Sequence, residues 1–201
     1  MIQGGGPDKS VFIRALGRKR TSRDDHSPGA IAMERKIFDL KGHAHFVTFS
    51  CYRRRRILDD NRAKGIVIHF LADQLRKADG SCIGFVIMPD HVHAVVHFKE
   101  AGMLSQFMQQ WKRRSSIQLK ECLKKHIPSY ATSIDMSEPI WQARYYDFNL
   151  FSRKMINEKL EYMHNNPVKA GLVAEVVDWK HCSARWYLFG QPVGIEIAGF
   201  R

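Results

Sequence analysis

The sequence lacks the features that mark a membrane protein or a disulfide-stabilised secreted protein. It contains no apolar run long enough to span a bilayer and no lipidation motif. Near the N-terminus, Val11–Leu16 is too short and too interrupted to be a signal-peptide core. No C-x-x-C pair occurs, so we interpret the scattered cysteines as reduced thiols and not as a zinc cluster: Cys51, Cys82, Cys122 and Cys182. We therefore expect a cytoplasmic protein without a membrane partner.

Acidic residues are scarce relative to basic ones. The 201 residues include 32 Lys and Arg but only 20 Asp and Glu, which gives a net charge of +12 and a pI near 9.7. Residues 1–56 alone hold 13 basic and 5 acidic residues. Such a balance favours a polyanionic partner, nucleic acid first.

The chain length favours one domain with its own core, and no internal repeat is visible. Residues 1–33 are rich in Gly, Ser and charge, which predicts a flexible basic leader. This leader is interpreted either as the result of a start site assigned too far upstream or as a tail that contacts DNA. We expect a single domain over residues 34–190 and a C-terminal tail over residues 191–201.

Hydrophobic periodicity predicts an alternation of strands and helices. Alternating and β-branched stretches indicate strands, and apolar residues at helical spacing indicate helices. The expected order is strand His45–Cys51, helix 60–78, strands Cys82–Met88 and Val92–Phe98, helix Leu104–Lys125, strand Ile140–Asn149, and a helix capped by Ser152. This order predicts an α+β fold, namely a ferredoxin-like antiparallel sheet with helices packed on one face.

The stretch Met88–Phe98, MPDHVHAVVHF, carries the first candidate site. Side chains two apart in a strand point to the same face, so His91 and His93 should project together while Val92 enters the core. Two adjacent imidazoles can hold a divalent metal and leave coordination positions open. The alternative is a half-buried strand with two surface histidines.

The stretch Leu160–Val173, LEYMHNNPVKAGLV, carries the second candidate site. A helix from Ser152 should reach Asn165 or Asn166, because Pro167 cannot continue it. Tyr162 and Asn166 would then share one face of the last turn and offer a nucleophilic hydroxyl beside a ligand oxygen. The alternative is that Tyr162 packs and Asn166 caps the helix.

Together these two stretches resemble the single-tyrosine HUH transposases, and most closely their REP-associated tyrosine transposase branch. RYYDFN at residues 144–149, and Asp178-Trp179 through Ser183-Ala184-Arg185, are similar to flanking motifs of that branch. The resemblance covers roughly residues 44–187. It implies that His91 and His93 are metal ligands, that Asn166 is a third ligand where insertion-sequence relatives carry Gln, and that Tyr162 is the nucleophile.

The resemblance also implies a function. The chain would be a transposase that cleaves and rejoins single-stranded or hairpin DNA through a 5′-phosphotyrosine, with Mg²⁺ or Mn²⁺ and no nucleotide cofactor. It implies a ferredoxin-like fold, in agreement with the periodicity, and allows a monomer or a homodimer. Two alternatives stay open: a non-catalytic basic nucleic-acid-binding protein, and a metal-dependent phosphodiesterase that uses water.

Basic and aromatic residues offer further contacts to nucleic acid. Two basic clusters are candidates for phosphate contact: Arg53, Arg54, Arg55 and Arg56, and Lys112, Arg113 and Arg114. Trp111, Trp141, Tyr145 and Tyr146 are available for base stacking, although core packing also uses aromatics. Tyr145 and Tyr146 are rival nucleophiles, but a strand places only one of them on a given face, so we expect one to be in the core.

Overall fold

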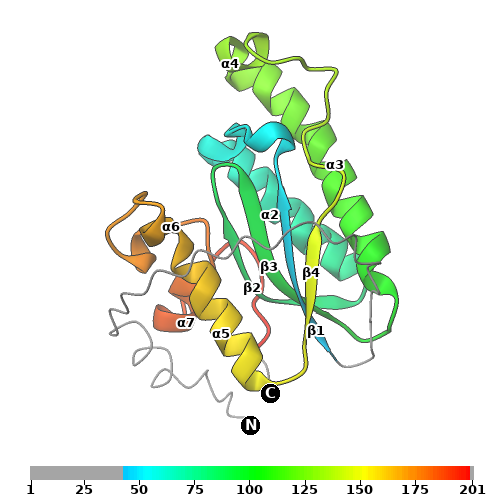
Figure 1. Cartoon of the computed structure of the whole chain (residues 1–201), viewed down its shortest axis with the longest axis vertical. Coiled ribbons are helices and arrows are strands. Elements are labelled where there is room, and N and C mark those ends of the chain that lie inside the picture. The colour runs from blue at the N-terminus through cyan, green and yellow to red at the C-terminus, as the bar shows by residue number, and fades with distance from the viewer. Residues whose placement is uncertain (1–42, 200–201) are drawn as a thin grey trace, which may run out of the picture.

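Figure 1 shows a computed structural model of the chain, which describes residues 43–199. The predicted leader, residues 1–33, lies outside the described residues, as do residues 34–42 of the predicted domain. Residues 191–199 of the predicted tail lie against the rest of the chain. Val193 and Ile197 are buried there, and the Ala198 N–H donates to the Cys82 carbonyl.

An antiparallel sheet with strand order β2-β3-β1-β4 forms the centre of the molecule. Two long helices connect its strands in the order strand, helix, strand, strand, helix, strand, which is the ferredoxin-like pattern. The elements are β1 (Ala44–Ser50), α2 (Asn61–Lys77), β2 (Gly80–Ile87), β3 (His91–Phe98), α3 (Met103–His126) and β4 (Tyr146–Leu150). The predicted α+β class and sheet type are confirmed.

Helices α2 and α3 cover one face of the sheet, where the largest part of the core lies. Phe49 of β1 packs edge-on against Trp111 of α3, with ring centroids 4.8 Å apart, and Phe98 packs against Phe107 at 5.2 Å. The helix predicted after Ser152 is observed as α5 (Arg153–His164), which crosses the opposite face of the sheet, in front of it in Figure 1. The strand β3 is therefore buried on both sides over most of its length.

Short elements complete the fold. They are η1 (Tyr52–Arg54), η2 (Ile57–Asp59), α4 (Pro128–Thr132), α6 (Asn166–Lys169), η3 (Val176–Asp178) and α7 (Ala184–Phe189). All four cysteines are buried and unpaired. Among residues 43–199, no helix is long and apolar enough to cross a membrane.

The C-terminal segment covers the outer edge of β2. The Ile87 N–H donates to the His181 carbonyl and the Ser183 N–H donates to the Phe85 carbonyl. The Trp179 indole donates to the Ile87 carbonyl at 3.0 Å. The stretch 178–185, which resembles a family motif, therefore protects a sheet edge that would otherwise present unpaired backbone groups.

The strand predicted at Ile140–Asn149 is shorter than expected and is observed only at Tyr146–Leu150. Trp141 makes an isolated bridge to Cys51 and is buried against Phe49. The Lys112 ammonium donates to the Gln142 and Ala143 carbonyls at 2.6 and 2.8 Å. The Gln142 N–H donates to the Ser50 carbonyl and the Tyr52 N–H donates to the Ile140 carbonyl, so residues 140–142 still pair with the end of β1. The predicted strand is therefore interrupted between this bridge and Tyr146.

Candidate active site

The two histidines of β3 lie side by side on the sheet face that α5 covers. Their ring centroids are 4.8 Å apart and the rings are nearly perpendicular. Val92 between them is fully buried on the opposite face. The alternation predicted for this strand is therefore confirmed.

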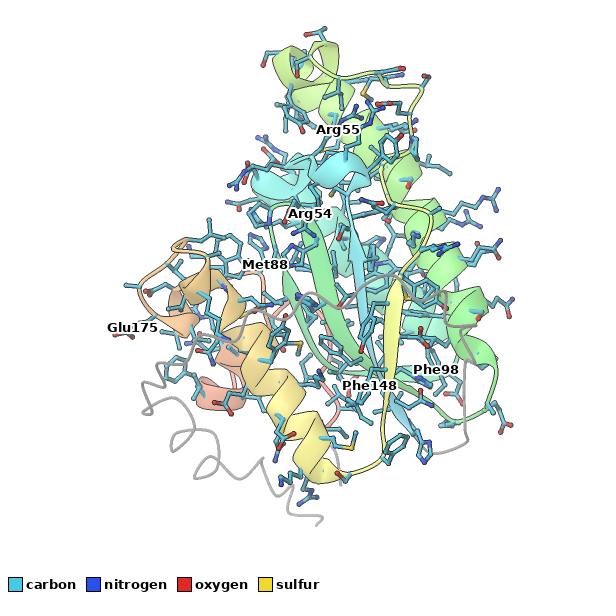
Figure 2. All side chains as sticks on the ribbon, viewed as in Figure 1. Arg54, Arg55, Met88, Phe98, Phe148 and Glu175 are labelled. Carbon is cyan, nitrogen blue, oxygen red and sulfur yellow. The ribbon has the colours of Figure 1, made fainter. Side chains whose placement is uncertain are left out.

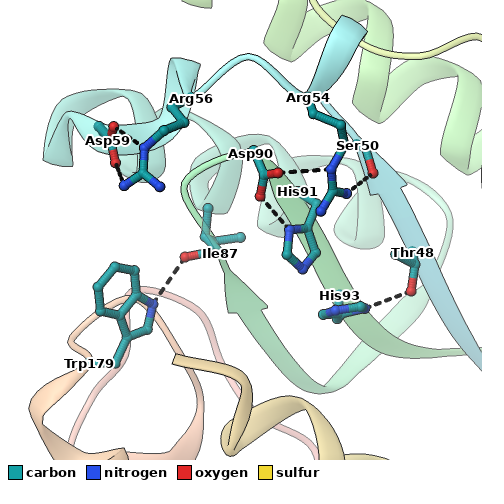
Figure 3. Close-up of polar contacts among 10 residues, drawn as sticks. All are labelled: Thr48, Ser50, Arg54, Arg56, Asp59, Ile87, Asp90, His91, His93 and Trp179. Carbon is teal, nitrogen blue, oxygen red and sulfur yellow. Dashed lines mark hydrogen bonds and ion pairs between the residues drawn. The ribbon is translucent and has the colours of Figure 1, made fainter. Parts of the chain in front are cut away.

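One nitrogen of each ring is held by a neighbouring side chain (Figure 3). His91 Nδ1 lies 2.6 Å from Asp90 Oδ1, and His93 Nδ1 lies 2.6 Å from Thr48 Oγ1. Because an ionised carboxylate only accepts hydrogen bonds, His91 donates from Nδ1 and leaves Nε2 unprotonated. Among the described residues, no hydrogen bond is made to Nε2 of His91 or of His93.

The Asp90 carboxylate is itself held by Arg54. Arg54 Nε lies 2.9 Å from Asp90 Oδ2, and its NH1 donates to Ser50 Oγ at 2.8 Å. Arg54 and its neighbour Arg53 have φ values of 56° and 54°, in the left-handed region that non-glycine residues rarely adopt. Such strain persists only where surrounding contacts enforce it, and here it accompanies the connection from Arg54 through Asp90 to His91.

Both imidazoles are kept neutral by their surroundings. Burial lowers the pKa of His93 to about 3, with a further contribution from neighbouring His91. Burial also lowers the pKa of His91, although the hydrogen bond to Asp90 opposes this shift. A neutral imidazole with a free Nε2 is the form that binds a metal ion.

These two rings fit a divalent metal as part of a mixed nitrogen and oxygen ligand set. A carboxylate behind a ligating histidine is a common arrangement at metal sites, since it fixes the tautomer and raises basicity. Within residues 43–199 no group of three or more His, Cys, Asp and Glu side chains could hold a metal. Further ligands would therefore have to be amide oxygens, water or the substrate itself.

Tyr162 of α5 is the tyrosine that meets this pair. Its ring centroid is 5.8 Å from that of His93 and 6.2 Å from that of Phe46, edge-on to both. Tyr162 is 45% exposed, so its hydroxyl-bearing ring contacts both His93 and solvent. The alternative of a packed, inaccessible tyrosine does not describe this environment.

The local sequence explains how α5 reaches the sheet. Ser152 caps the helix as predicted, accepting a hydrogen bond from the Met155 N–H. Gly84 of β2 lies beneath it, where a Cβ would be 2.3 Å from Leu160 Cδ2 and 2.6 Å from Met163 Cε. The absence of a side chain at Gly84 lets the helix approach closely enough to place Tyr162 against His93.

Two lysines flank the tyrosine ring. Lys159 Nζ lies 5.6 Å from the Tyr162 ring centroid, and Lys169 Nζ lies 5.4 Å from it. Lys159 also lies over the rings of Phe46 and Phe148, at 5.1 and 5.3 Å. Positive charge is therefore concentrated beside the Tyr162 ring.

Asn166 does not share the last turn of the Tyr162 helix, as the sequence predicts it would. The helix α5 ends at His164, Asn165 caps it, and Asn166 begins α6. Pro167 lies in the first turn of α6, where a missing N–H is tolerated, so it starts a new helix instead of only ending the old one. Asn166 is half-buried, four residues after Tyr162, and its role as a ligand stays a prediction.

The basic residues predicted to contact nucleic acid have diverse partners. Arg54 binds Asp90, Arg56 binds Asp59, and both Arg53 and Arg55 bind Glu138. Lys112 is directed to backbone carbonyls, and burial lowers its pKa. Arg113 and Arg114 are exposed on α3. Figure 2 labels Arg54 and Arg55 at the end of the sheet where β1 leads into η1.

The groups that support the histidines and the tyrosine are not predicted from the sequence. Asp90 directly precedes His91, and an acid in that position beside a metal-type histidine is a usable signal. Thr48 and Lys159 give no signal, because their contacts depend on strand register and helix placement. Of the rival tyrosines, Tyr145 packs partly buried against the core, whereas Tyr146 is 52% exposed.

Comparison with known proteins identifies the family of this chain. Residues 39–166 match the family described as "Transposase IS200 like". The chain is 24% identical over 146 residues to the REP-associated tyrosine transposase of Escherichia coli K12, covering 73% of this chain and 79% of that protein. It is 30% identical over 108 residues to a putative REP-associated tyrosine transposase of Haemophilus influenzae, covering 50% of this chain and 57% of that protein.

A solved structure shares the fold. It is a REP-associated tyrosine transposase bound to a REP hairpin, and it aligns with a TM-score of 0.60 and 21% identity. The alignment covers 83% of this chain and 94% of that one.

Proposed function

Because this chain belongs to the IS200-like transposase family, we propose that it acts as a REP-associated tyrosine transposase and cleaves and rejoins single-stranded DNA through Tyr162. The observation that carries the proposal is the contact between the Tyr162 ring and His93, beside a second histidine whose Nδ1 is also occupied. A nucleophile and a metal-type histidine pair thus meet on one open face.

The chemistry assigned to Tyr162 is a phosphoryl transfer. The phenolic oxygen attacks the phosphorus, a P–O bond forms to the tyrosine, and the bond to the 3′ oxygen breaks. The phenolic proton goes to solvent and the leaving 3′ oxygen ends as a hydroxyl. The resulting 5′-phosphotyrosine retains the phosphodiester energy, so a second 3′-hydroxyl can reverse the step without ATP.

His91 and His93 would hold Mg²⁺ or Mn²⁺ through their Nε2 atoms, with Asn166 as a further oxygen ligand. When bound, such a metal would polarise the phosphoryl oxygen and fix its orientation. Asp90 keeps the His91 ring in the required tautomer, and Thr48 holds the direction of the His93 ring. Lys159 and Lys169 offset the negative charge of the phosphate beside Tyr162.

The proposed substrate is a single strand beside a hairpin. A related structure is described as bound to a REP hairpin, and this chain shares its fold. The net charge of +12 suits a nucleic-acid partner. No nucleotide cofactor is needed, because the transferred bond carries the energy.

The test is incubation of the protein with a labelled, hairpin-bearing single strand and Mn²⁺, followed by a denaturing gel. We expect cleavage with a labelled protein–DNA adduct, and loss of both in EDTA, in His91→Ala and in His93→Ala. Salt-dependent DNA binding should largely survive these substitutions, because phosphate contacts elsewhere supply most of the affinity. Cleavage without any adduct would favour a water-using phosphodiesterase, and binding without cleavage would favour a non-catalytic DNA-binding protein.

A further inference from the structure

Exposed aromatic side chains are concentrated beside the candidate active site. Tyr146 and Phe148 of β4 are 52% and 38% exposed, and Tyr162 is 45% exposed. Figure 2 labels Phe148 on this strand. Neighbouring exposed aromatic surface is unfavourable in water unless something covers it, which makes this surface a candidate contact site.

Strand register places these rings on the active-site face. Tyr146 pairs with Thr48, and Thr48 pairs with His93, so all three side chains lie on the same side of the sheet. Phe148 likewise pairs with Phe46, whose ring stacks on His93 at 5.4 Å. Lys159 reaches over Phe148 from α5, so Phe148 faces the same helix as the histidines.

The distance between Tyr146 and the histidines matches the length of a few nucleotides. Tyr146 is two strand spacings from His93, which corresponds to about 10 Å. This equals about three nucleotides at the stacked spacing of roughly 3.4 Å, and fewer in an extended strand. Within residues 43–199, β4 is an outer strand of the sheet, so a chain can leave across it.

The chemistry of the surface favours single-stranded DNA as its occupant. Aromatic faces beside a cation are the combination with which proteins bind bases and phosphates of single strands. Lys159 supplies that cation between Phe46, Phe148 and Tyr162. Duplex DNA offers only stacked bases whose faces are covered, so it could not use the same rings.

We propose that Tyr146 and Phe148 form a base-stacking platform that holds the unpaired nucleotides next to the phosphate attacked by Tyr162. This inference rests on the proposed function, because it assigns a place to the substrate of that same site. Lys159 neutralises a phosphate between the platform and the tyrosine. The platform sets which bond lies under the Tyr162 hydroxyl and so contributes to cleavage position.

The platform can be tested with 2-aminopurine, whose fluorescence is quenched on stacking. The probe is a hairpin oligonucleotide with 2-aminopurine placed in turn at each of the three unpaired nucleotides on either side of the cleaved bond. Binding is measured in EDTA with Tyr162→Phe, so that no cleavage occurs. We expect quenching at one or two positions, and its loss in Tyr146→Leu and Phe148→Leu with about tenfold weaker binding of the single strand for each.

Matched variants separate stacking from folding. Tyr146→Trp should show the quenching that Tyr146→Leu loses, because it retains an aromatic face. Phe189→Leu, which alters an exposed aromatic on α7, should leave quenching and affinity unchanged. Circular dichroism of every variant identifies any that fails to fold. If a leucine variant fails to fold, the quenching measured with Tyr146→Trp decides the test.

Several outcomes would overturn the platform. Unchanged quenching and affinity in both leucine variants would do so, even if the wild-type protein forms its tyrosine adduct normally. Variants that dissociate a homodimer while leaving quenching unchanged would instead make this surface an interface between copies. Conversely, an absent adduct with intact, Tyr146-dependent quenching would reject the proposed catalysis and retain the platform.

Discussion

At the scale of single residues, the site depends on side chains that hold other side chains. Asp90 binds the Nδ1 of His91, and Arg54 binds Asp90 from the opposite side at 2.9 Å. Thr48 does the same for His93 from the neighbouring strand. These contacts restrict rotation of the two histidine rings, so their Nε2 atoms have fixed directions.

Replacing Asp90 with Asn should weaken metal binding more than it weakens folding. The amide can no longer accept as strongly from His91 Nδ1, so the ring loses its fixed tautomer and part of its basicity. We expect a roughly 10- to 100-fold loss of Mn²⁺ affinity, measured by electron paramagnetic resonance of free Mn²⁺. Asp59→Asn, which breaks only an exposed pair with Arg56, is the control. Equal Mn²⁺ affinity in wild type and Asp90→Asn would reject the support role.

Buried His164 makes stability sensitive to acid. It is fully buried with Nε2 2.7 Å from Ser183 Oγ, and burial lowers its pKa to about 3. The unfolded chain takes up this proton below about pH 6.5 while the folded chain does not. The contribution of His164 to stability is thus complete above about pH 6.5 and is lost as the pH falls toward about 3, by about 1.4 kcal/mol per pH unit.

Denaturant unfolding between about pH 7 and about pH 4 tests this expectation. His164→Gln should be less stable at neutral pH but should lose stability less steeply as the pH falls. His126→Gln, on the surface at the end of α3, should keep the wild-type slope. An identical acid slope in His164→Gln and wild type would show that His164 is not the responsible group.

Single residues differ in how far the sequence predicts them. His91 and His93 follow from strand alternation, which needs no knowledge of the rest of the fold. Arg54 and Asp90 are far apart in the sequence, and their contact depends on η1 folding back over the β2–β3 turn. Local patterns carry no information on such a contact.

At the scale of elements, the position of α5 on β2 decides where Tyr162 lies. Gly84 is the point of closest approach, beneath Leu160 and Met163. Both side chains are buried, so neither has free space into which to move. A methyl group at this position must therefore push the helix away from the sheet.

Gly84→Ala should lower the free energy of unfolding by about 1–3 kcal/mol through overpacking, and should slow cleavage more than it weakens DNA binding. In a Leu160→Ala background the added cost should be smaller, because one of the clashing atoms is gone. Gly65→Ala on α2, where no atom lies within 4 Å of the new Cβ, should be neutral or stabilising. A Gly84→Ala protein with wild-type stability and cleavage would contradict this account of helix placement.

Most elements are predictable from the sequence because their residues repeat at clear periods. The caps Asp60 and Ser152 accept hydrogen bonds from the first helical turns, as such residues typically do. The interruption before β4 is not predictable, because it accompanies contacts of Lys112 on α3 with the Gln142 and Ala143 carbonyls, and these residues are far apart in the sequence. The placement of α5 on the second face likewise depends on packing at Gly84.

At the scale of the whole molecule, the net positive charge is divided between residues 1–42 and the rest of the chain. Residues 1–42 contain 9 basic and 5 acidic residues, so the remaining 159 residues keep most of the net charge of +12. The ferredoxin-like order was predictable, since few topologies accommodate that sequence of elements. Whether the chain acts as a monomer or a homodimer depends on surfaces that periodicity does not describe.

A chain that begins at Met33 should fold and cleave DNA, because the family match starts at residue 39 and the site lies wholly beyond it. It should bind DNA more weakly at moderate salt, since the truncation removes basic residues that can contact phosphates. Each phosphate that is no longer neutralised should reduce the salt dependence of single-strand binding by about 0.7 in slope. Titrations of labelled oligonucleotide at several salt concentrations measure this. Complete loss of cleavage in a folded truncated protein would show that the leader takes part in catalysis.

The most direct test of the central claim is to locate the covalent bond. Wild-type protein is incubated with labelled hairpin DNA and Mn²⁺, denatured and digested, and the peptide that carries the nucleotide is identified by mass. We predict that it contains Tyr162, that Tyr162→Phe forms no adduct, and that Tyr145→Phe and Tyr146→Phe still form it. An adduct that persists in Tyr162→Phe, or that maps to Tyr145 or Tyr146, would contradict the assignment of Tyr162 as the nucleophile.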